Sequence, residues 1–455
     1  MGKRMRLLLV RPPRRNANDT GLSVPPLGLA YIAAMVRESD HEVDILDAYA
    51  LDMSWTAFEA EIAKRRPDVV GLTAMTPVAD VAARAVNIVR PYVDRIVMGG
   101  PHPTAIGEAI FSEIPGLDAS VIGEGEPIII PLLDWWANGG KGAPPPGVRV
   151  RNAPYVAAPQ PDPSSLPLPA RDLLPNHAYR YLFATQRGFA TMISSRGCPF
   201  RCSFCDKSVG GSKWRARQPS DVVDEMERLQ NEFGVGFINF YDDNFTLNKK
   251  RVMGICNEIL RRGLQVEWKC EGRVDNADPD MLALMRRAGC RVVAYGVESA
   301  NPETLALLRK DISVEQSISA FAQTRAAGLR SLAYMILGAP GEDAVAVQKS
   351  IDFCRDIGAD YVQFSTLSAM PGTPLFSHPR ADSAPVTNPL DADQCRATLT
   401  NMPTDELASL VRQAWTGFYL RPRPIARLLR DAWASGTIDE AWRMGRALTR
   451  WHRAA

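Results

Sequence analysis

Short apolar runs alternate with amphipathic stretches along the first part of the chain. The apolar runs cover residues 6–10, 42–48, 68–74, 95–100 and 119–126, and the amphipathic stretches between them cover 27–39, 55–66 and 79–92. Strand-like runs separated by helix-period segments indicate βαβ units around a parallel sheet. We therefore predict an α/β, doubly wound (Rossmann-like) domain over residues 1–137.

The same alternation resumes later in the chain, after a proline-rich segment. Closely spaced prolines disfavour regular helices and sheet ladders, so residues 138–185 are predicted to be a linker. Strand candidates then occur at 190–195, 237–243, 267–272, 292–299, 332–338 and 361–366, with helical stretches at 220–233, 249–263, 278–289, 313–328 and 344–358. This series predicts a partial TIM-like (β/α)6 barrel over 186–389, with its chemistry at the C-terminal strand ends. A helical region follows over 390–455.

Charge and hydropathy narrow the range of partners. The chain has 455 residues, with 53 Lys and Arg against 51 Asp and Glu, a net charge of +2. Neither a basic stripe nor a nucleic-acid module is visible, so we expect no nucleic-acid partner. The apolar run near the N-terminus is too short for a signal peptide, and no run reaches the roughly 20 residues of a spanning helix. These features favour a cytoplasmic protein.

A cysteine loop directly after the first predicted barrel strand carries the most specific chemistry. In SSRGCPFRCSFCDKS, the thiols of Cys198, Cys202 and Cys205 have C-x3-C-x2-C spacing. Thiolates are the ligands of iron–sulfur clusters, and three of them leave one iron of a 4Fe-4S cluster open. The alternatives are a three-cysteine zinc loop or plain burial. Zinc sites pair such a loop with a distant Cys or His pair, whereas the remaining cysteines are scattered: Cys256, Cys270, Cys290, Cys354 and Cys395.

The cysteine loop resembles that of the radical S-adenosylmethionine (SAM) superfamily, with aromatic Phe204 before the third cysteine. The resemblance implies that the open iron binds SAM and that electron transfer cleaves it to a 5′-deoxyadenosyl radical. The protein would position the cofactor, which supplies the chemistry.

Further stretches resemble the SAM-contacting strand ends of this superfamily. Asp242 and Asp243 end the second barrel strand, where acidic groups suit the methionyl amine. Arg273 follows the third strand and is expected to hold the methionyl carboxylate with both guanidinium amino groups. Glu298 ends the fourth strand and is expected to accept from ribose hydroxyls.

Glycines complete the set after the fifth strand. Gly338 and Gly341 occur in a GAPGE turn, where glycine permits close approach to the adenine. Each strand-end residue also has an ordinary structural alternative: an aspartate can cap a helix, and an arginine can form a surface ion pair. Their order at successive strand ends favours the SAM interpretation.

The N-terminal domain resembles the cobalamin-binding domain that precedes the barrel in one large radical SAM class. The resemblance rests on residues 25–30, 41–43, 69–74, 99–104 and 123–126. It implies that Thr73, Ala74 and Met75 face the lower side of the corrin. Gly99, Gly100 and Gly123 would allow close approach to its tail.

A histidine ligand to cobalt is not evident in this domain. The DxHxxG loop of many corrinoid proteins is absent, as it commonly is in this class. His102 lies in one matching loop, and Glu124 lies in another. Both are cofactor-contact candidates, although packing or hydrogen bonding within the loop is the preferred explanation for His102. A vestigial domain without corrin is the other alternative.

The resemblance to class B radical SAM methyltransferases and anaerobic Mg-protoporphyrin cyclase-like proteins sets the functional expectations. The leading one is a C-methyltransferase acting on an unactivated carbon of a small-molecule or lipid/tetrapyrrole-type product. Alternatives are a cyclase, ring-contraction or rearrangement enzyme, and a non-enzymatic iron–sulfur or corrin sensor. An electron donor such as flavodoxin or ferredoxin is expected. The Arg- and Trp-rich C-terminal helices either pack on the barrel or contact a membrane surface.

Overall fold

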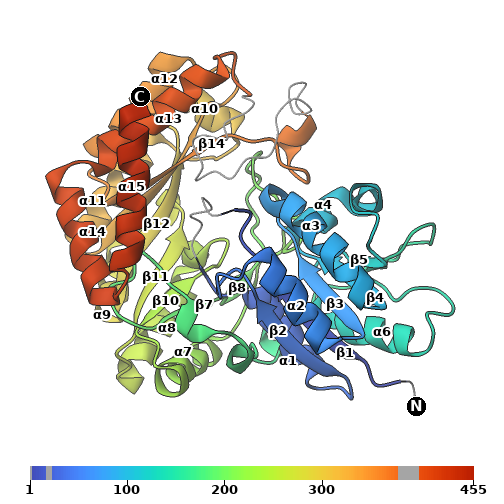
Figure 1. The fold of residues 1–455 in the computed structure, drawn as a ribbon. Coiled ribbons are helices and arrows are strands. Elements are labelled where there is room, and N and C mark those ends of the chain that lie inside the picture. Colours follow the sequence, from blue (N-terminus) through green and yellow to red (C-terminus); the bar gives the residue numbers. More distant parts are fainter. Residues whose placement is uncertain (1–2, 17–22, 378–398, 455) are drawn as a thin grey trace. The chain divides into compact units, whose positions relative to one another are not determined.

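A computed structural model describes residues 3–16, 23–377 and 399–454 (Figure 1). The chain divides into two compact units. The first comprises Met1–Tyr179 and Asp206–Gly211, and the second comprises Arg180–Cys205 and Ser212–Ala455. Residues 138–179 of the proline-rich segment therefore belong to the first unit. The predicted boundary at 389/390, and Cys395, lie outside the described residues.

A twisted sheet with the strand order β2-β1-β3-β4-β5-β6 forms the centre of the first unit. Its strands are β1 (Arg6–Arg11), β2 (Glu42–Asp47), β3 (Val69–Thr73), β4 (Arg95–Gly99), β5 (Ala119–Val121) and β6 (Val148–Arg149). All neighbouring pairs are parallel except β5 and β6. The first five strands have the flavodoxin-like order, in which ligands bind where the order reverses, beyond the C-terminal ends of β1 and β3.

Helices cover both faces of this sheet, which explains why the central strands β1, β3 and β4 are apolar and buried along most of their length. They are α1 (Leu27–Val36), α2 (Trp55–Arg65), α3 (Ala79–Val89), α4 (Pro101–Ile106), α5 (Ile110–Glu113) and α6 (Glu126–Ala137). Leu8 and Val10 share one core with Phe58 of α2 and Val86 of α3. Helices α1 and α6 contact each other. The predicted doubly wound fold is confirmed.

The second unit contains an open, curled half-barrel of six parallel strands in the order β14-β13-β12-β11-β10-β7. The strands are β7 (Phe189–Met192), β10 (Phe237–Phe240), β11 (Glu267–Gly272), β12 (Cys290–Glu298), β13 (Arg330–Leu337) and β14 (Tyr361–Thr366). A separate antiparallel pair, β8 (Ser195–Arg196) with β9 (Arg215–Ala216), flanks the cysteine loop. The predicted partial barrel is confirmed.

Helices pack on the outer face of the half-barrel. They are α7 (Pro219–Phe233), α8 (Lys249–Arg262), α9 (Pro279–Arg287), α10 (Pro302–Leu307), α11 (Val314–Ala326) and α12 (Ala344–Asp356). Side chains alternate along each strand. On β11, Trp268 and Cys270 belong to the helix-side core, so Lys269 and Glu271 point to the concave side.

The C-terminal helices continue this shell. They are α13 (Thr404–Tyr419), α14 (Pro422–Ser435) and α15 (Ile438–Ala454). Trp415 lies edge-on to Phe364 of β14, and the Tyr419 hydroxyl donates to the Val362 carbonyl. These contacts support packing on the barrel for α13. On α14 and α15, however, Trp433 and Trp442 are exposed.

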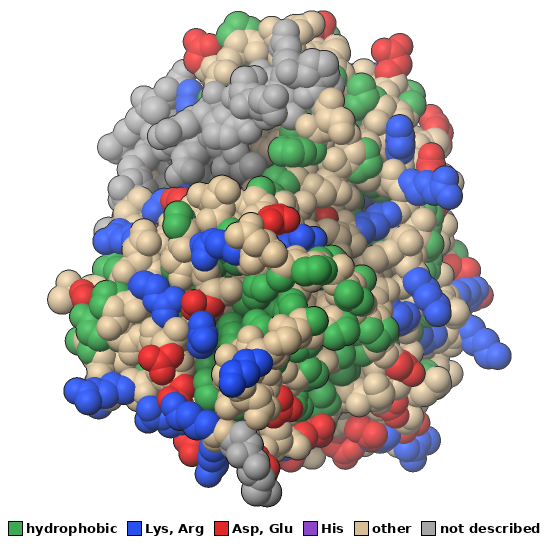
Figure 2. Space-filling view, turned by 90° about the vertical axis from the view of Figure 1, so that its right-hand side faces the viewer, with side chains coloured by type: hydrophobic (Ala, Val, Ile, Leu, Met, Phe, Trp, Pro, Cys, Tyr) green, Lys and Arg blue, Asp and Glu red, His purple; other side chains and the backbone are tan. Residues whose placement is uncertain are grey.

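Two surface observations bear on partners. Within the described ranges, no helix is long and apolar enough to cross a membrane. On the face drawn in Figure 2, hydrophobic side chains gather in the middle, and acidic and basic side chains are interspersed around them. Among the described side chains of that face, basic residues form no continuous stripe.

Candidate active site

The cysteine loop is anchored to two distant parts of the second unit. Its residues Cys198 and Cys205 are half-buried and Cys202 is buried, and all three thiols are free of disulfides. The Ser203 amide donates to the Leu308 carbonyl at 2.9 Å, and the Leu375 amide donates to the Ser203 carbonyl at 3.1 Å. The loop is therefore held by the segments that follow β12 and β14.

Phe204 fixes the same loop through apolar contacts. It packs against a small core that includes Leu308, Ala339 and Leu367. These three residues come from different strand ends, after β12, β13 and β14 respectively. The structure therefore gives Phe204 a packing role next to Cys205, and its predicted cofactor contact stays a prediction.

Arg273 lies beside the buried cysteine at the end of β11. Its Nη1 is 4.0 Å from the Cys202 sulfur, and its guanidinium carbon is 3.6 Å from the centroid of the Phe200 ring. The same group forms a two-pronged pair with Asp275, and its Nη2 donates to the Lys310 carbonyl at 2.8 Å. A buried guanidinium stabilises negative charge on a nearby sulfur. Arg273 is therefore suited to a thiolate-bound group.

The two aspartates after β10 hold the start of the cysteine loop. Asp242 is buried and accepts from the Ser194 amide and hydroxyl, both at 2.7 Å, and from the Ser195 hydroxyl at 2.5 Å. Asp243 accepts from the Gly197 amide at 2.9 Å. Burial raises the pKa of Asp242 above its ordinary value, although Arg251 and the serine donors oppose this. The structure thus shows both aspartates as positioning residues, and their predicted contact with the methionyl amine stays a prediction.

Glu298 forms a buried ion pair at the end of β12. The Lys310 Nζ lies 2.6 Å from Glu298 Oε1, and both side chains are nearly inaccessible. Glu298 has φ +66°, a strained conformation for a non-glycine residue. A Cβ on Gly296 would lie 2.3 Å from Glu298 Oε1 and 2.4 Å from Lys310 Nζ. Glycine at position 296 therefore makes room for the pair.

The GAPGE turn after β13 is closed by its own glutamate. Glu342 is buried and accepts from the amides of Gly338 and Ala339, at 3.0 and 2.9 Å. Its other oxygen accepts from the Ser299 and Thr304 hydroxyls. Gly338 and Gly341 both have positive φ, at +82° and +85°. The turn is therefore tied to the residues that follow Glu298.

The concave side of the barrel carries a polar layer below Arg273. Lys269 is fully buried, is paired with Glu271, and lies 3.4 Å from Asn239 Oδ1. The Tyr334 hydroxyl donates to Glu271 Oε1 at 3.2 Å. The other oxygen, Glu271 Oε2, is buried and has no hydrogen-bond partner among the described residues. Barrel interiors are ordinarily filled by apolar branched residues, so this layer is a candidate substrate contact.

In the first unit, the predicted corrin contacts gather at one edge of the sheet. Thr73 ends β3, Ala74 and exposed Met75 follow it, and Gly99 ends the neighbouring strand β4. Gly100 has φ +101°, and a Cβ there would lie 2.7 Å from Thr73 Oγ1 and 2.9 Å from the Ala74 carbonyl oxygen. Glycine at position 100 therefore lets these loops approach closely beside the reversal in strand order.

The remaining first-unit candidates are more enclosed. His102 is buried, and its two ring nitrogens lie 3.2 Å from Thr76 Oγ1 and 3.0 Å from Glu113 Oε1. Both nitrogens are thus engaged, which supports the packing explanation. Gly123 follows β5 with φ +86° and donates to Thr104 Oγ1, whereas Glu124 is buried.

The cysteine loop supplies the donor set of the predicted cluster, with a guanidinium beside it. In the described part of the chain, no three His, Cys, Asp or Glu side chains are gathered to hold a single metal ion. The fit therefore rests on the chemistry of the loop: three thiols outside any disulfide within eight residues, 198–205, beside a buried guanidinium. This donor set suits a thiolate-bound iron–sulfur cluster.

Comparison with known proteins identifies both units. The profile of the radical SAM superfamily matches residues 192–354, and that of the B12-binding domain matches residues 15–130. "Uncharacterized methyltransferase PH0819" of Pyrococcus horikoshii is 35% identical over 438 residues, covering 93% of this chain and 95% of that protein. The chain belongs to the cobalamin-binding radical SAM family.

Other members of this family show its range. The "anaerobic magnesium-protoporphyrin IX monomethyl ester cyclase" of Rubrivivax gelatinosus is 30% identical over 392 residues, covering 82% of this chain and 69% of that protein. A solved structure, the radical SAM methyltransferase TsrM of Kitasatospora setae with cobalamin and a 4Fe-4S cluster bound, matches with a TM-score of 0.69. It is 22% identical, with 85% of this chain and 76% of that chain covered, and it supports the fold.

Family membership settles the cofactors and the class of protein. This radical SAM protein is an enzyme related to cobalamin-dependent methyltransferases, which excludes the sensor alternative. Its cofactors are a 4Fe-4S cluster, SAM and cobalamin, and, like other radical SAM enzymes, it uses a reductant and a substrate. The residues that contact each cofactor remain predictions.

Three residues at this site were not singled out by the sequence: Lys310, Glu342 and Glu271. Lys310 lies in a loop, and nothing local indicates its pairing with Glu298. Glu342 follows the predicted glycines directly and could have been found as the acidic residue that closes the turn. Glu271 could have been found as a charged residue at an inward position of a barrel strand.

Proposed function

We propose that this enzyme transfers a methyl group from SAM to an unactivated carbon of a small-molecule or lipid/tetrapyrrole-type substrate. The observation that carries the proposal is the occurrence, in one chain, of a radical SAM half-barrel with a three-cysteine loop and a B12-binding unit. The methyltransferase name of the P. horikoshii relative, similar along nearly its whole length, supports the same reaction.

The bound groups supply the reaction chemistry: reductive SAM cleavage yields a carbon-centred radical, and the corrin carries the methyl group. In our proposal, Cys198, Cys202 and Cys205 ligate the cluster, and Asp242 and Asp243 fix the loop that presents them. Arg273 offsets the negative charge of the thiolates and holds the loop through Phe200.

We propose that SAM binds at the ends of β12 and β13, which buried hydrogen bonds connect to each other. Glu298 ends β12, and Gly338 and Gly341 follow β13. Ser299 joins the two turns through Glu342. Gly338 and Gly341 present backbone without a side chain, which suits a flat adenine ring. The corrin is proposed to lie against Thr73–Met75 and the Gly99–Gly100 turn.

The polar layer on the concave side bears on the substrate. Glu271 Oε2 is a buried acceptor without a partner, and such an atom is costly unless a donor reaches it. A substrate that enters this side is therefore proposed to offer an O–H or N–H group to Glu271, with Tyr334 beside it. This favours a polar substrate, or the polar end of a lipid, over an unbroken hydrocarbon. The electron donor is proposed to be a flavodoxin or ferredoxin.

A cyclase or rearrangement reaction is the second candidate, and the similarity to the R. gelatinosus cyclase favours it. One experiment separates the two: anaerobic incubation of the reconstituted enzyme with SAM, a reductant and cobalamin. Methyl transfer predicts S-adenosylhomocysteine whose formation requires cobalamin. Deoxyadenosine without S-adenosylhomocysteine would exclude methylation and leave the cyclase or rearrangement.

A further inference from the structure

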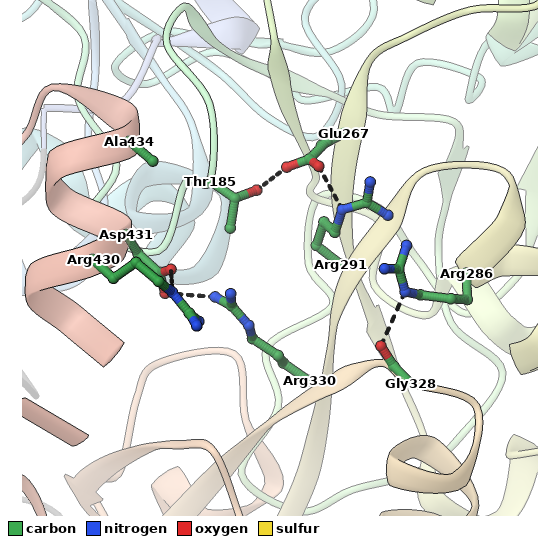
Figure 3. A pocket seen from close by; sticks show the side chains of 9 residues that line it. All are labelled: Thr185, Glu267, Arg286, Arg291, Gly328, Arg330, Arg430, Asp431 and Ala434. Atoms are coloured by element: carbon green, nitrogen blue, oxygen red, sulfur yellow. Dashed lines mark hydrogen bonds and ion pairs between the residues drawn. The ribbon is translucent and has the colours of Figure 1, made fainter. Parts of the chain in front are cut away.

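A cavity of about 460 Å³ lies at the N-terminal end of the barrel strands, and Figure 3 shows the side chains that line it. The residues that line it are Thr185, Glu267, Arg286, Arg291, Gly328, Arg330, Arg430, Asp431 and Ala434. Glu267 begins β11, six residues before Arg273. At about 3.3 Å per residue, the cavity is roughly 20 Å from the cysteine loop along that strand. It is therefore distinct from the proposed active site.

Arginine dominates the wall of this cavity. Four guanidinium groups and two carboxylates line it. Glu267 accepts from Arg291 Nε at 2.5 Å and from the Thr185 hydroxyl. Asp431 is buried and accepts from Arg330 Nη1 at 2.5 Å, from the Tyr361 hydroxyl and, at 3.5 Å, from Arg430 Nε. Both acids are thus already engaged.

The guanidinium groups, by contrast, keep most of their donors. Each arginine has five N–H groups in a fixed fork. Arg286 is half-buried, and its Nε donates to the Gly328 carbonyl at 3.0 Å. No carboxylate in the described ranges pairs with it. Figure 3 shows Arg286 and Arg291 on one side of the cavity and Arg330 and Arg430 on the other. A ligand between them would meet donors from both sides.

We propose that this cavity binds a small organic phosphate, with Arg286 and Arg291 as its principal ligands. The oxygens of an ionised phosphate act as hydrogen-bond acceptors. A guanidinium group can donate two parallel hydrogen bonds to two of these oxygens. The volume falls within the range of small-molecule pockets, so it leaves room for an organic part beyond the phosphate. The wall of the cavity has more hydrogen-bond donors, on its arginines, than acceptors. This excess, rather than positive charge alone, favours a phosphate as the ligand.

Binding at this cavity would couple the C-terminal helices to the barrel. Arg430, Asp431 and Ala434 belong to α14, whereas Arg291 and Arg330 begin β12 and β13. A ligand that contacts both sides therefore stabilises the docking of α14, because a ligand that binds only the folded state raises its stability by RT ln(1 + [L]/Kd). The site thus offers a way for a phosphorylated metabolite to stabilise the enzyme without entering the active site.

Isothermal titration of the anaerobically reconstituted full chain tests this proposal. The probes are pyrophosphate and glycerol 3-phosphate, with glycerol and matched sodium chloride as controls. We expect saturable binding of both phosphates at submillimolar to millimolar concentration, with a rise in Tm, and none for glycerol. Arg286→Gln should weaken binding about tenfold or more, because it removes a charged ligand that has no carboxylate partner.

Arg287→Gln is the matched control, since Arg287 is exposed, adjacent on α9 and absent from the cavity wall. It should leave affinity within about twofold. Absence of saturable binding, equal binding to wild type and Arg286→Gln, or an equal loss in Arg287→Gln would overturn the proposal. An effect that sodium chloride reproduces would show ionic screening only and would overturn it equally. None of these outcomes depends on the methyltransferase assay.

Discussion

Lys310 and Glu298 form a buried ion pair with an Nζ to Oε1 distance of 2.6 Å, and the Lys310 carbonyl accepts from Arg273 beside Cys202. Through these contacts the end of β12, the end of β11 and the cysteine loop form one connected unit. The sequence places these residues far apart, at separations of 12, 37 and 71 positions. The ion pair therefore helps to position Arg273 and the cysteine loop of the proposed cofactor site.

Glu298→Gln should lower the free energy of unfolding by about 3–5 kcal/mol, the usual cost of leaving one buried charge without its partner. Lys310 would be that charge, since both side chains are nearly inaccessible. The double variant Glu298→Gln/Lys310→Met should recover part of the loss. Urea denaturation of the apoprotein measures the free energy of unfolding of the wild type, the single variant and the double variant. A loss below about 1 kcal/mol for Glu298→Gln would show that the pair is not buried in solution.

Arg273→Lys should keep the iron content but change the electron paramagnetic resonance spectrum of the reduced cluster and weaken SAM binding. Lysine retains the charge but loses the stacking on Phe200 and the two-pronged pair with Asp275. Exposed Arg261 on α8 provides the control, as Arg261→Lys. An unchanged spectrum and SAM affinity in Arg273→Lys would remove Arg273 from the cluster environment.

Gly100→Ala should abolish retention of cobalamin on gel filtration, with a loss of affinity of about tenfold or more. The added Cβ would meet Thr73 Oγ1 and the Ala74 carbonyl oxygen, and φ at this position is +101°. Gly28 on α1 has no neighbour within 4 Å of a built Cβ, so Gly28→Ala is the control. The corrin absorbance per chain is the readout. Normal retention by Gly100→Ala would place the corrin elsewhere.

Asp242→Asn should accelerate iron loss to a chelator, because an amide has one acceptor oxygen and cannot accept from the Ser194 amide as well as the two serine hydroxyls, as the carboxylate does. The variant also tests a pH effect. Burial raises the folded-state pKa of Asp242, so the native state binds this proton more readily than the unfolded chain does. Its contribution to stability is therefore present below the ordinary pKa and is lost as pH rises through the folded value.

The corresponding measurement is urea denaturation of the apoprotein at several pH values from about 4 upward. The stability of wild type relative to Asp242→Asn should fall as pH rises across the raised pKa of Asp242. A difference that grows with pH would mean that the serine donors and Arg251 outweigh burial, and that the pKa is lowered instead.

Periodicity and local motifs predicted the strands, the two folds and the cysteine loop, because each depends on residues close in sequence. The strand β6 was missed, since it has two residues within a proline-rich segment and pairs antiparallel to β5. The arginine-lined cavity was invisible for another reason. It joins strand starts to α14, as Arg330 and Asp431 do across 101 positions. Contacts of this range follow from tertiary packing and leave no local pattern.

Deoxyadenosine formation measures the central claim most directly. The reconstituted enzyme is incubated anaerobically with SAM and a one-electron reductant, and wild type is compared with Cys202→Ala and with Cys256→Ala, whose thiol is buried on α8 outside the loop. We predict about four iron atoms per chain and deoxyadenosine from wild type and Cys256→Ala, and neither from folded Cys202→Ala. Deoxyadenosine from Cys202→Ala, or none from iron-loaded wild type, would contradict the assignment of the cysteine loop.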